Sequence, residues 1–387
     1  MIVAGEASGD AHAAALVRAL HEEAAGMRLE FFGSTGRLMR EAGVHSIVQA
    51  DELSIVGLLE IGGALPKFWQ AFRELKRAGL EREPDAVVLV DWPDFNLRLA
   101  RSLHRRGLKI IYYISPQLWA WRSHRVRQIR RDVDLLLAIL PFEPDWYKAR
   151  GVTHVEFTGH PLAGAVRARY GREEFCRLHN LDTARPIIAL LPGSRRKELE
   201  RILPPLLDAA LQINQTKAEA QFVLVIAPNR SPAEAEEIIA AHNESETLRS
   251  ILRITHRETR EALAAADAAA IASGTATLEA AILGTPLVVV YKESATNWHT
   301  LGRLISAEHF GLVNLIARER IVPELMQNDL TGPRLAQELL ALLEPQRNTA
   351  IRARLHEATA QLGAGGASHR AAQTILEFLR NEADLRG

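Results

Sequence analysis

Residues 86–96 read AVVLVDWPDFN, and this stretch decides the fold. An apolar run over 86–90 ends at Asp91, a proline-containing turn follows, and an amphipathic stretch begins at Phe95. A run that is apolar on both of its faces is typical of a parallel strand covered by helices on both sides. The stretch therefore predicts a strand–turn–helix unit whose polar residues lie just beyond the carboxyl end of a buried strand.

The same unit recurs along the chain. Expected strands of the first half lie at 1–4, 29–32, 86–90, 109–114, 135–139 and 155–158. Those of the second half lie at 186–191, 222–227, 252–254, 268–271 and 286–291. Strands that alternate with helices predict doubly wound parallel sheets of an α/β protein. We expect two Rossmann-like domains, over 1–165 and 166–350. A helical tail over 351–387 follows, and it could pack back on the N-terminal domain.

Composition narrows the function classes. The chain has 387 residues, of which 47% are hydrophobic and 24% charged, as in soluble globular proteins. Its 47 basic and 47 acidic residues give zero formal net charge, which argues against broad electrostatic binding of nucleic acid. A single cysteine, Cys176, excludes a disulfide scaffold and suits a reducing cytoplasm. The amino terminus has no signal-peptide pattern, no run is long enough to span a membrane, and the histidine spacings do not indicate a metal site.

Two glycines frame the turn after the first expected strand, in AGEASGD at 4–10. Gly5 and Gly9 allow close backbone approach, and the free amides of a helix start favour an anion or sugar hydroxyls. An ordinary turn in which Ser8 or Asp10 caps the helix explains the motif equally well. The spacing is not the dinucleotide pattern G-x-G-x-x-G, so a dehydrogenase is not expected.

Two carboxylates follow the strand at 86–90. Either Asp91 or Asp94 could accept a proton from an attacking hydroxyl at the edge of a cleft. The alternative is that Asp94 caps the following helix and Asp91 begins a turn. Pro93 fits both interpretations, and the sequence does not decide between the two carboxylates.

Aromatic residues and arginines follow the strand at 109–114, in YYISPQLWAWR at 112–122. Ser115, Trp119 and Arg122 are candidates for the acceptor side of a cleft, because aromatic rings at its edge could stack on a sugar or line an acyl groove. Tryptophans at this spacing are more often part of a core. The arginine-rich stretch 122–131 predicts a basic helix face, which is either a solvated surface or a contact for anionic headgroups.

Two turns in the second half suit a diphosphate. In LLPGSRRKE at 190–198, Gly193 and Ser194 leave backbone amides free and Arg195 adds positive charge. In ASGTATLEAA at 272–281, hydroxyls and amides at a helix start suit a phosphate, and Glu279 lies within reach of ribose hydroxyls. A capping box is the alternative for the second turn. Together the turns favour a nucleotide-diphosphate site, and neither matches the ATPase P-loop.

An apolar, glycine-punctuated stretch, SIVGLLEIGGALPKFWQAF, occupies 54–72. A core helix is its default explanation. Because the stretch lies between strands as an insert, it could instead present an apolar surface to lipid. The candidate membrane contacts are Val56, Leu58, Leu59, Ile61 and Leu65.

These motifs, taken in order, resemble the blocks of one family, the lipid-A-disaccharide synthases. The resemblance covers nearly the whole chain and also includes LPFE at 140–143, TGHP at 158–161 and LVNLIARERIVPELMQ at 312–327. The first three blocks are specific to this family, whereas ASGTATLE is shared more loosely by other GT-B enzymes. The chain starts closer to its first strand than the resemblance would suggest, but no motif is missing.

The resemblance implies a GT-B fold and an inverting glycosyltransferase at the cytoplasmic surface of the inner membrane of Gram-negative bacteria. The donor would be UDP-2,3-diacylglucosamine and the acceptor 2,3-diacylglucosamine 1-phosphate, or lipid X, with no cofactor or metal. Asp91 matches the family's proposed general base. The donor-side candidates are Gly193, Ser194, Arg195, Ser273, Gly274, Thr275, Ala276, Thr277, Glu279, Asn314 and Gln327. The acceptor or cleft candidates are Gly5, Glu6, Ser8, Gly9, Asp10, Ser115, Trp119 and Arg122.

Two other functions remain open at this point. One is another UDP-sugar GT-B enzyme, such as a soluble N-acetylglucosaminyltransferase or a 2-epimerase, which the turn at 272–279 alone would allow. The other is a UDP-sugar-binding peripheral membrane protein without catalytic activity. The apolar insert and the first three motifs favour the transferase. The sequence is compatible with a homodimer but does not give the oligomeric state.

Overall fold

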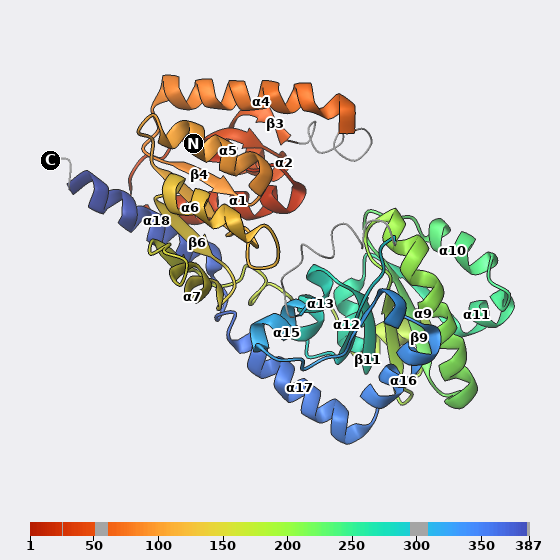
Figure 1. The fold of residues 1–387 in the computed structure, drawn as a ribbon. Coiled ribbons are helices and arrows are strands. Elements are labelled where there is room, and N and C mark those ends of the chain that lie inside the picture. The colour runs from red at the N-terminus through yellow and green to blue at the C-terminus, as the bar shows by residue number, and fades with distance from the viewer. Residues whose placement is uncertain (25, 51–60, 295–308, 385–387) are drawn as a thin grey trace. The chain divides into compact units, whose positions relative to one another are not determined.

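The computed structural model describes residues 1–24, 26–50, 61–294 and 309–384. The chain forms two compact units, Met1–Ala163 with Leu362–Gly387, and Gly164–Gln361. Each unit is a parallel sheet covered by helices on both faces, which confirms the predicted fold class (Figure 1). Because the chain returns to the first unit at Leu362, the expected tail is divided between the two units.

The first unit contains a seven-stranded parallel sheet in the order β3-β2-β1-β4-β5-β6-β7. Its strands are β1 (Ile2–Val3), β2 (Phe32–Thr35), β3 (His45–Gln49), β4 (Val87–Val90), β5 (Ile110–Tyr113), β6 (Leu135–Ala138) and β7 (Val155–Phe157). Its helices are α1 (Ala7–Glu23), α2 (Arg37–Glu41), α4 (Ile61–Arg82), α5 (Pro93–His104), α6 (Val126–Asp132), α7 (Glu143–Lys148) and α18 (Ala367–Asp384).

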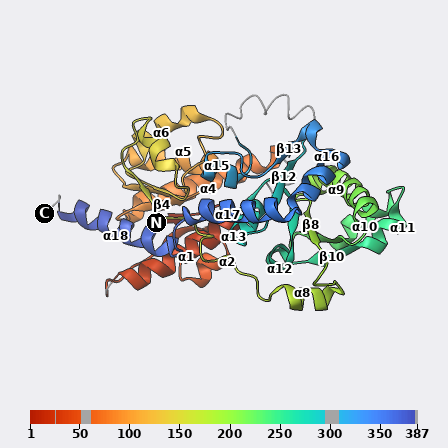
Figure 2. The same ribbon diagram turned by 90° about the horizontal axis from the view of Figure 1, so that it is seen from below.

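Two apolar clusters hold these layers together. One joins α4, α5, α6 and α7 to one face of the sheet, and Tyr112 of β5 belongs to it. The other joins α1, α2 and α18 to the opposite face and contains Tyr113. Figure 2 shows β4 between these two groups of helices. Neighbouring residues of β5 therefore pack on opposite faces, as the alternation of side chains along a strand requires.

The second strand lies at Phe32–Thr35, so the expected strand at 29–32 was wrong in position. Gly33 lies so close to β1 that a Cβ there would come within 1.8 Å of the Ile2 carbonyl oxygen. The Ser34 hydroxyl donates to the Ala4 carbonyl at 2.9 Å. Small and hydrogen-bonded residues thus make up most of this strand, which is why its sequence is not an apolar run.

The second unit contains a six-stranded parallel sheet in the order β10-β9-β8-β11-β12-β13. Its strands are β8 (Ile187–Leu191), β9 (Gln221–Ile226), β10 (Leu252–His256), β11 (Ala268–Ala272), β12 (Leu287–Tyr291) and β13 (Glu324–Met326). One layer of helices contains α9 (Arg196–Thr216), α10 (Pro232–Ala240), α11 (Ser245–Ile251) and α16 (Gly332–Leu342). The other contains α8 (Arg172–His179), α12 (Thr259–Ala265), α13 (Thr275–Ile282), α15 (Leu312–Ala317) and α17 (Pro345–Ala360).

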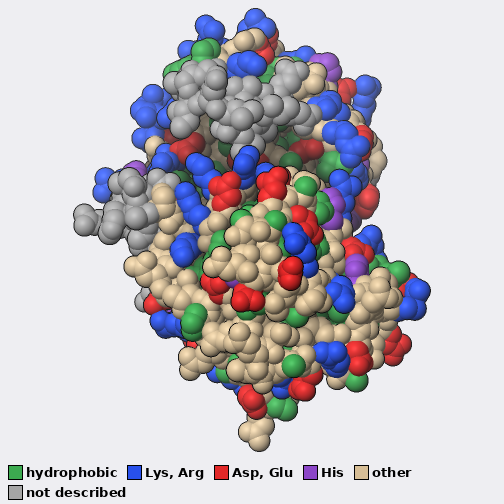
Figure 3. Space-filling model, turned by 90° about the vertical axis from the view of Figure 1, so that its right-hand side faces the viewer, with side chains coloured by type: hydrophobic (Ala, Val, Ile, Leu, Met, Phe, Trp, Pro, Cys, Tyr) green, Lys and Arg blue, Asp and Glu red, His purple; other side chains and the backbone are tan. Residues whose placement is uncertain are grey.

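Charges of both signs are interspersed on the face that Figure 3 shows, as expected for a chain with zero net charge. Across the described ranges, no helix combines the length and apolar character needed to cross a membrane.

Candidate functional site

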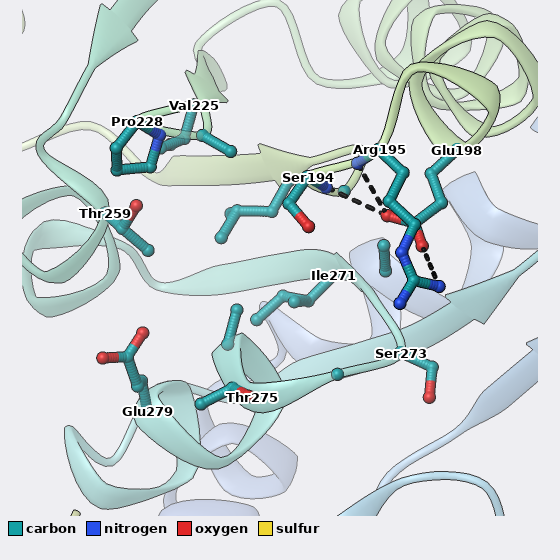
Figure 4. A pocket seen from close by; sticks show the side chains of 16 residues that line it. Ser194, Arg195, Glu198, Val225, Pro228, Thr259, Ile271, Ser273, Thr275 and Glu279 are labelled. Carbon is teal, nitrogen blue, oxygen red and sulfur yellow. Dashed lines mark hydrogen bonds and ion pairs between the residues drawn. The ribbon is translucent and has the colours of Figure 1, made fainter. Parts of the chain in front are cut away.

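The central strand of the second sheet, β8, creates a crevice at its carboxyl end. From β8 the chain passes through α9 to β9 on one side, and it later returns to β11 on the other side. The loops after β8 and β11 therefore diverge, which is where open parallel sheets bind ligands. A cavity of about 400 Å³ lies at this point, and it lies entirely within the second unit (Figure 4).

Eight of the predicted donor residues line this cavity. They are Gly193, Ser194, Arg195, Ser273, Gly274, Thr275, Ala276 and Glu279. Figure 4 shows Ser194, Arg195 and Glu198 coming from the β8–α9 junction, and Thr275 and Glu279 from α13. The strand topology therefore brings together two motifs that are about eighty residues apart in the sequence.

The turn after β8 is held by Glu198, which the sequence analysis did not single out. Its Oε2 accepts from the backbone amides of Ser194 at 3.0 Å and Arg195 at 3.1 Å. The expectation that the Ser194 amide is free for a phosphate is therefore wrong, and the Arg195 amide is engaged as well. The Arg195 side chain is 80% exposed, and its Nη1 lies 3.6 Å from Oε1 of Glu198. The turn therefore presents the Arg195 guanidinium to the cavity, and the Glu198 carboxylate compensates its charge only in part.

The turn after β11 places the start of α13 at the cavity. Gly274 is the N-terminal flanking residue of this helix and carries no side-chain cap. The capping-box alternative for this turn is therefore wrong. No acidic residue stands in the first turn of α13. Because the amides at a helix start carry partial positive charge, this edge of the cavity is suited to an anion.

Glu279 faces the cavity from one turn further along α13. Its Oε1 accepts from Nε of Arg260 at 2.9 Å and also lies 2.8 Å from Nη2 of the same residue. Arg260 in turn donates to the Ala165 carbonyl. The carboxylate is thus held in one orientation, with its other oxygen not engaged by Arg260.

Three predicted donor residues do not line the cavity. The Thr277 hydroxyl donates to the Gly274 carbonyl at 2.7 Å and so stabilises the start of α13. Asn314 is fully buried, and its amide bonds to the Val322 backbone and to Glu324. Oε1 of Gln327 accepts from the Glu293 amide at 3.3 Å. These three side chains shape the surrounding loops.

Other lining residues come from β9 and from the helix that follows β10. Val225 belongs to β9, Ala227 and Pro228 follow its carboxyl end, and Thr259 begins α12. These residues are uncharged and belong to none of the motifs, so their residue types gave no reason to choose them as site residues. The rule that ligands bind at the carboxyl ends of strands would have selected Ala227 and Pro228.

The first sheet has its own switch point between β1 and β4, where the loops carrying Gly5 and Asp91 meet. The Trp92 ring lies directly over Gly5, where a Cβ would come within 2.1 Å of Cδ2 of that ring. Trp92 also stacks on Phe95, with ring centroids 4.1 Å apart. Gly5 is thus required by the close approach of an aromatic ring.

The two candidate bases have different environments. Burial raises the pKa of the Asp91 carboxyl above its ordinary value, and the negative charge of Glu6 raises it further. For Asp94 partial burial would also raise the pKa, but Arg125 and Arg122 outweigh it and lower the pKa below its ordinary value. Their guanidinium groups lie 2.6 and 2.8 Å from Oδ1 of Asp94. Asp94 does not cap α5, so that alternative is wrong.

The residues at the start of α1 divide into exposed and structural ones. Glu6 and Ser8 are exposed, and Gly9 is buried in the first turns of the helix. Asp10 is also buried, and its carboxylate accepts from three backbone amides at 36–39. Neither Ser8 nor Asp10 caps α1, so that expectation is wrong. Asp10 instead fixes the turn before α2.

A buried carboxylate supports the segment after β5. Nε1 of Trp119 donates to Glu143 at 3.1 Å, and the amides of Ile139 and Leu140 donate to the same side chain. Burial raises the pKa of Glu143 to about 7, although these hydrogen bonds act to lower it. Ser115 and Trp119 are themselves buried, whereas Arg122 is half-buried and is the most accessible of the three candidates in this segment.

Of the five predicted membrane contacts, Val56, Leu58 and Leu59 lie outside the described residues, and so do the side chains of Ile61 and Leu65. Within the part of the chain that is described, no group of three or more His, Cys, Asp or Glu side chains is arranged to hold a metal ion.

The sequence of the whole chain matches one family. The model of the family described as "Lipid-A-disaccharide synthetase" matches residues 1–378. The chain belongs to the lipid-A-disaccharide synthase family. A lipid-A-disaccharide synthase of Geobacter sulfurreducens is 40% identical over 381 residues, covering 98% of this chain and 97% of the relative. One of Anaeromyxobacter dehalogenans (strain 2CP-C) is 43% identical over 383 residues, again covering 98% and 97%.

As a member of the lipid-A-disaccharide synthase family, the protein is a glycosyltransferase of lipid A biosynthesis. Solved structures add the fold. The co-structure of S. aureus MnaA with UDP has a TM-score of 0.65 at 13% identity, covering 98% of this chain and 96% of that chain. Anabaena Alr3699/HepE in complex with UDP-glucose has a TM-score of 0.58 at 12% identity, covering 97% and 98%. At these identities the likeness shows the fold alone, and that fold is GT-B.

Proposed function

We propose that the protein transfers 2,3-diacylglucosamine from UDP-2,3-diacylglucosamine to the 6-hydroxyl of lipid X. The bond from the sugar C1 to the β-phosphate oxygen breaks, and a bond from C1 to the acceptor oxygen forms on the opposite face. The configuration at C1 is therefore inverted, and the products are the β-1,6-linked disaccharide 1-phosphate and UDP. Family membership supports the reaction, and the cavity in the second unit supports the donor chemistry.

The observation that carries the donor assignment is the pairing of Arg195 with the uncapped start of α13 across one cavity. The diphosphate of UDP would lie between them. As the sugar leaves, negative charge grows on the β-phosphate, and donors that are already in place stabilise it without rearrangement. Glu279, held by Arg260, would accept from the ribose hydroxyls. Asn314 and Gln327 would act on the donor side through the loops that they fix.

Asp91 is the better of the two candidate bases. A general base works best when its pKa lies near the operating pH, and the pKa of Asp91 is raised whereas that of Asp94 is lowered. Asp94 is also engaged by Arg122 and Arg125. In this proposal Asp91 takes the proton of the 6-hydroxyl as it attacks C1, and Asp94 keeps the two arginines in place on the acceptor side.

The protein would work at the cytoplasmic surface of the inner membrane, because both proposed substrates carry acyl chains. The start of α4 and the segment before it would provide the apolar contact. Trp69, in the described part of α4, supports this assignment because its side chain is 58% exposed. A homodimer stays a prediction.

A UDP-release assay tests the proposal. Release is measured with diacylated donor plus lipid X and, separately, with donor alone. A transferase requires both substrates, an epimerase acts on a donor alone, and a binding protein releases no UDP in either case. Release that does not depend on lipid X would contradict the proposed reaction.

Variants of the two carboxylates then test the assignment of the base. Asp91→Asn should keep UDP binding and lose most turnover, by about 100-fold or more. Asp94→Asn should lose less, since it would loosen Arg122 and Arg125 without removing the base. Near-normal turnover of Asp91→Asn would remove Asp91 from the mechanism.

A further inference from the structure

Asp91 and Trp92 share a backbone conformation that is unusual for residues with side chains. Their φ angles are 48° and 51°, so two consecutive residues other than glycine occupy the left-handed region. L-amino acids disfavour this region because Cβ approaches the following carbonyl oxygen. Such residues persist where the surrounding structure holds them, and they gather at functional sites.

Hydrogen bonds from three directions hold this conformation. The Asp91 carbonyl oxygen accepts from the Tyr112 hydroxyl at 2.6 Å and from Nδ2 of Asn96 at 2.8 Å. The Asp91 amide donates to the Tyr113 carbonyl at 3.0 Å. Tyr112 and Asn96 are both fully buried. The peptide group between Asp91 and Trp92 is therefore fixed by β5 on one side and by α5 on the other.

We propose that Tyr112 and Asn96 are positioning residues for Asp91: by holding its carbonyl oxygen they set the direction of its carboxyl group. The inference rests on the proposed role of Asp91 as the base. A carboxylate that removes a proton must lie within hydrogen-bonding reach of that proton, and a displacement of 1 Å can greatly reduce the rate. Neither positioning residue needs to touch substrate.

The Tyr112 hydroxyl is suited to this task at any pH used for an assay. Burial raises its pKa far above the ordinary value for tyrosine, and the negative charge of Asp91 adds to the rise. The hydroxyl therefore keeps its proton and always donates. Nδ2 of Asn96 also donates to the Val90 carbonyl at 3.2 Å, which ties the end of β4 to the same side chain.

The chain provides a matched control in the next residue of the strand. Tyr113 is also fully buried, but it belongs to the cluster on the opposite face of the sheet. Tyr112→Phe and Tyr113→Phe each remove one buried hydroxyl from β5 and leave the ring. Only the first of these hydroxyls contacts Asp91.

The kinetic test compares these variants. Tyr112→Phe should lower kcat by about 10- to 100-fold while the KM values and the UDP dissociation constant change less than about twofold. Asn96→Leu, which keeps the side-chain volume without the donor, should act in the same direction. Tyr113→Phe should stay within about twofold of the wild type. Equal kcat values for Tyr112→Phe and Tyr113→Phe would overturn the inference.

A second readout does not depend on turnover. The Asp91 carboxyl can be titrated by NMR of protein with ¹³C-labelled aspartate, its signal being assigned with Asp91→Asn. Tyr112→Phe should lower the pKa of Asp91 toward its ordinary value, because a released carboxyl moves toward water and away from Glu6. Tyr113→Phe should leave it unchanged.

The two readouts separate this inference from the proposed function. Absence of transfer by the wild type would contradict the proposed reaction, and the titration would still show whether Tyr112 positions Asp91. A fall in kcat without a change in the titration would overturn the inference, since Tyr112 would then act elsewhere.

Discussion

Gly5→Ala should disturb the first unit although it adds only one methyl group. The new Cβ would lie 2.1, 2.2 and 2.6 Å from three atoms of the Trp92 ring. Carbon atoms in contact need more than 3 Å, so the ring must move by about 1 Å or more. That movement opposes the stack of Trp92 on Phe95 and the left-handed backbone next to Asp91.

The cost follows from these contacts. Overpacking of this kind costs about 1–3 kcal/mol, and loss of an aromatic stack accounts for about 0.5–1.5 kcal/mol of it. We expect the unfolding free energy of the first unit to fall by about 1–3 kcal/mol. We also expect kcat to fall, because Trp92 follows Asp91 directly. The dissociation constant of UDP should not change, since the cavity lies in the second unit.

Gly9→Ala is the matched control. A Cβ at Gly9 would lie 3.6 Å from the Ala4 Cβ and 3.8 Å from the Val90 carbonyl oxygen, which are ordinary contacts. Within α1, alanine in place of glycine should leave the stability unchanged or raise it by about 0.5–1 kcal/mol. Urea denaturation followed by tryptophan fluorescence measures both variants, and calorimetry measures UDP binding. Equal stability of Gly5→Ala and Gly9→Ala would refute the account of Gly5.

Three further predictions concern other parts of the molecule. Because the pKa of Glu143 is raised to about 7 in the folded state, its ionisation should lower the unfolding free energy by about 3 kcal/mol between pH 4.5 and 7, with no further fall above pH 7. Glu143→Gln should remove this fall, which urea denaturation at a series of pH values measures. If the unfolding free energy of the variant falls as much as that of the wild type, ionisation of Glu143 is not the cause. Asp10→Ala should lower the unfolding free energy by about 3 kcal/mol or more, because three amides lose their acceptor; a loss below 1 kcal/mol would show that they find other partners. Lysine at Leu58 and Leu59 should release the protein from anionic vesicles in a flotation assay, whereas persistent binding would assign the membrane contact elsewhere.

The sequence was sufficient to predict two parallel sheets, most of their strands, and the place of the cavity that we propose for the donor. Apolar runs such as 86–90 identify buried parallel strands, and ligands bind where the loops after neighbouring strands diverge. The turns at 193–195 and 273–276 could therefore be combined into one site before their neighbours were known. The short edge strands β3 and β13 were missed, since His45–Gln49 is only partly buried and Glu324–Met326 has three residues.

The partners of polar side chains could not be predicted in the same way. The N-terminal motif made Asp10 a candidate for ligand contacts and the family resemblance made Asn314 one, yet their side chains bond to the backbone at 36–39 and at Val322. Glu198 was overlooked, although it binds the amides of Ser194 and Arg195, the first of which was expected to be free. Which donor a carboxylate or an amide meets depends on how separate segments of the chain pack. That packing is a tertiary property that spacing along the sequence does not contain.

The central claim is that Arg195 and the start of α13 hold the diphosphate of UDP, and the affinity for UDP tests it most directly. Arg195→Ala removes a charge-assisted contact of about 1.5–3 kcal/mol, so the dissociation constant should rise by about 10- to 100-fold. Arg196→Ala is the control, because Arg196 is paired with Glu200 at 2.8 Å and does not line the cavity. Its dissociation constant should match that of the wild type. Equal dissociation constants for the two variants would contradict the account.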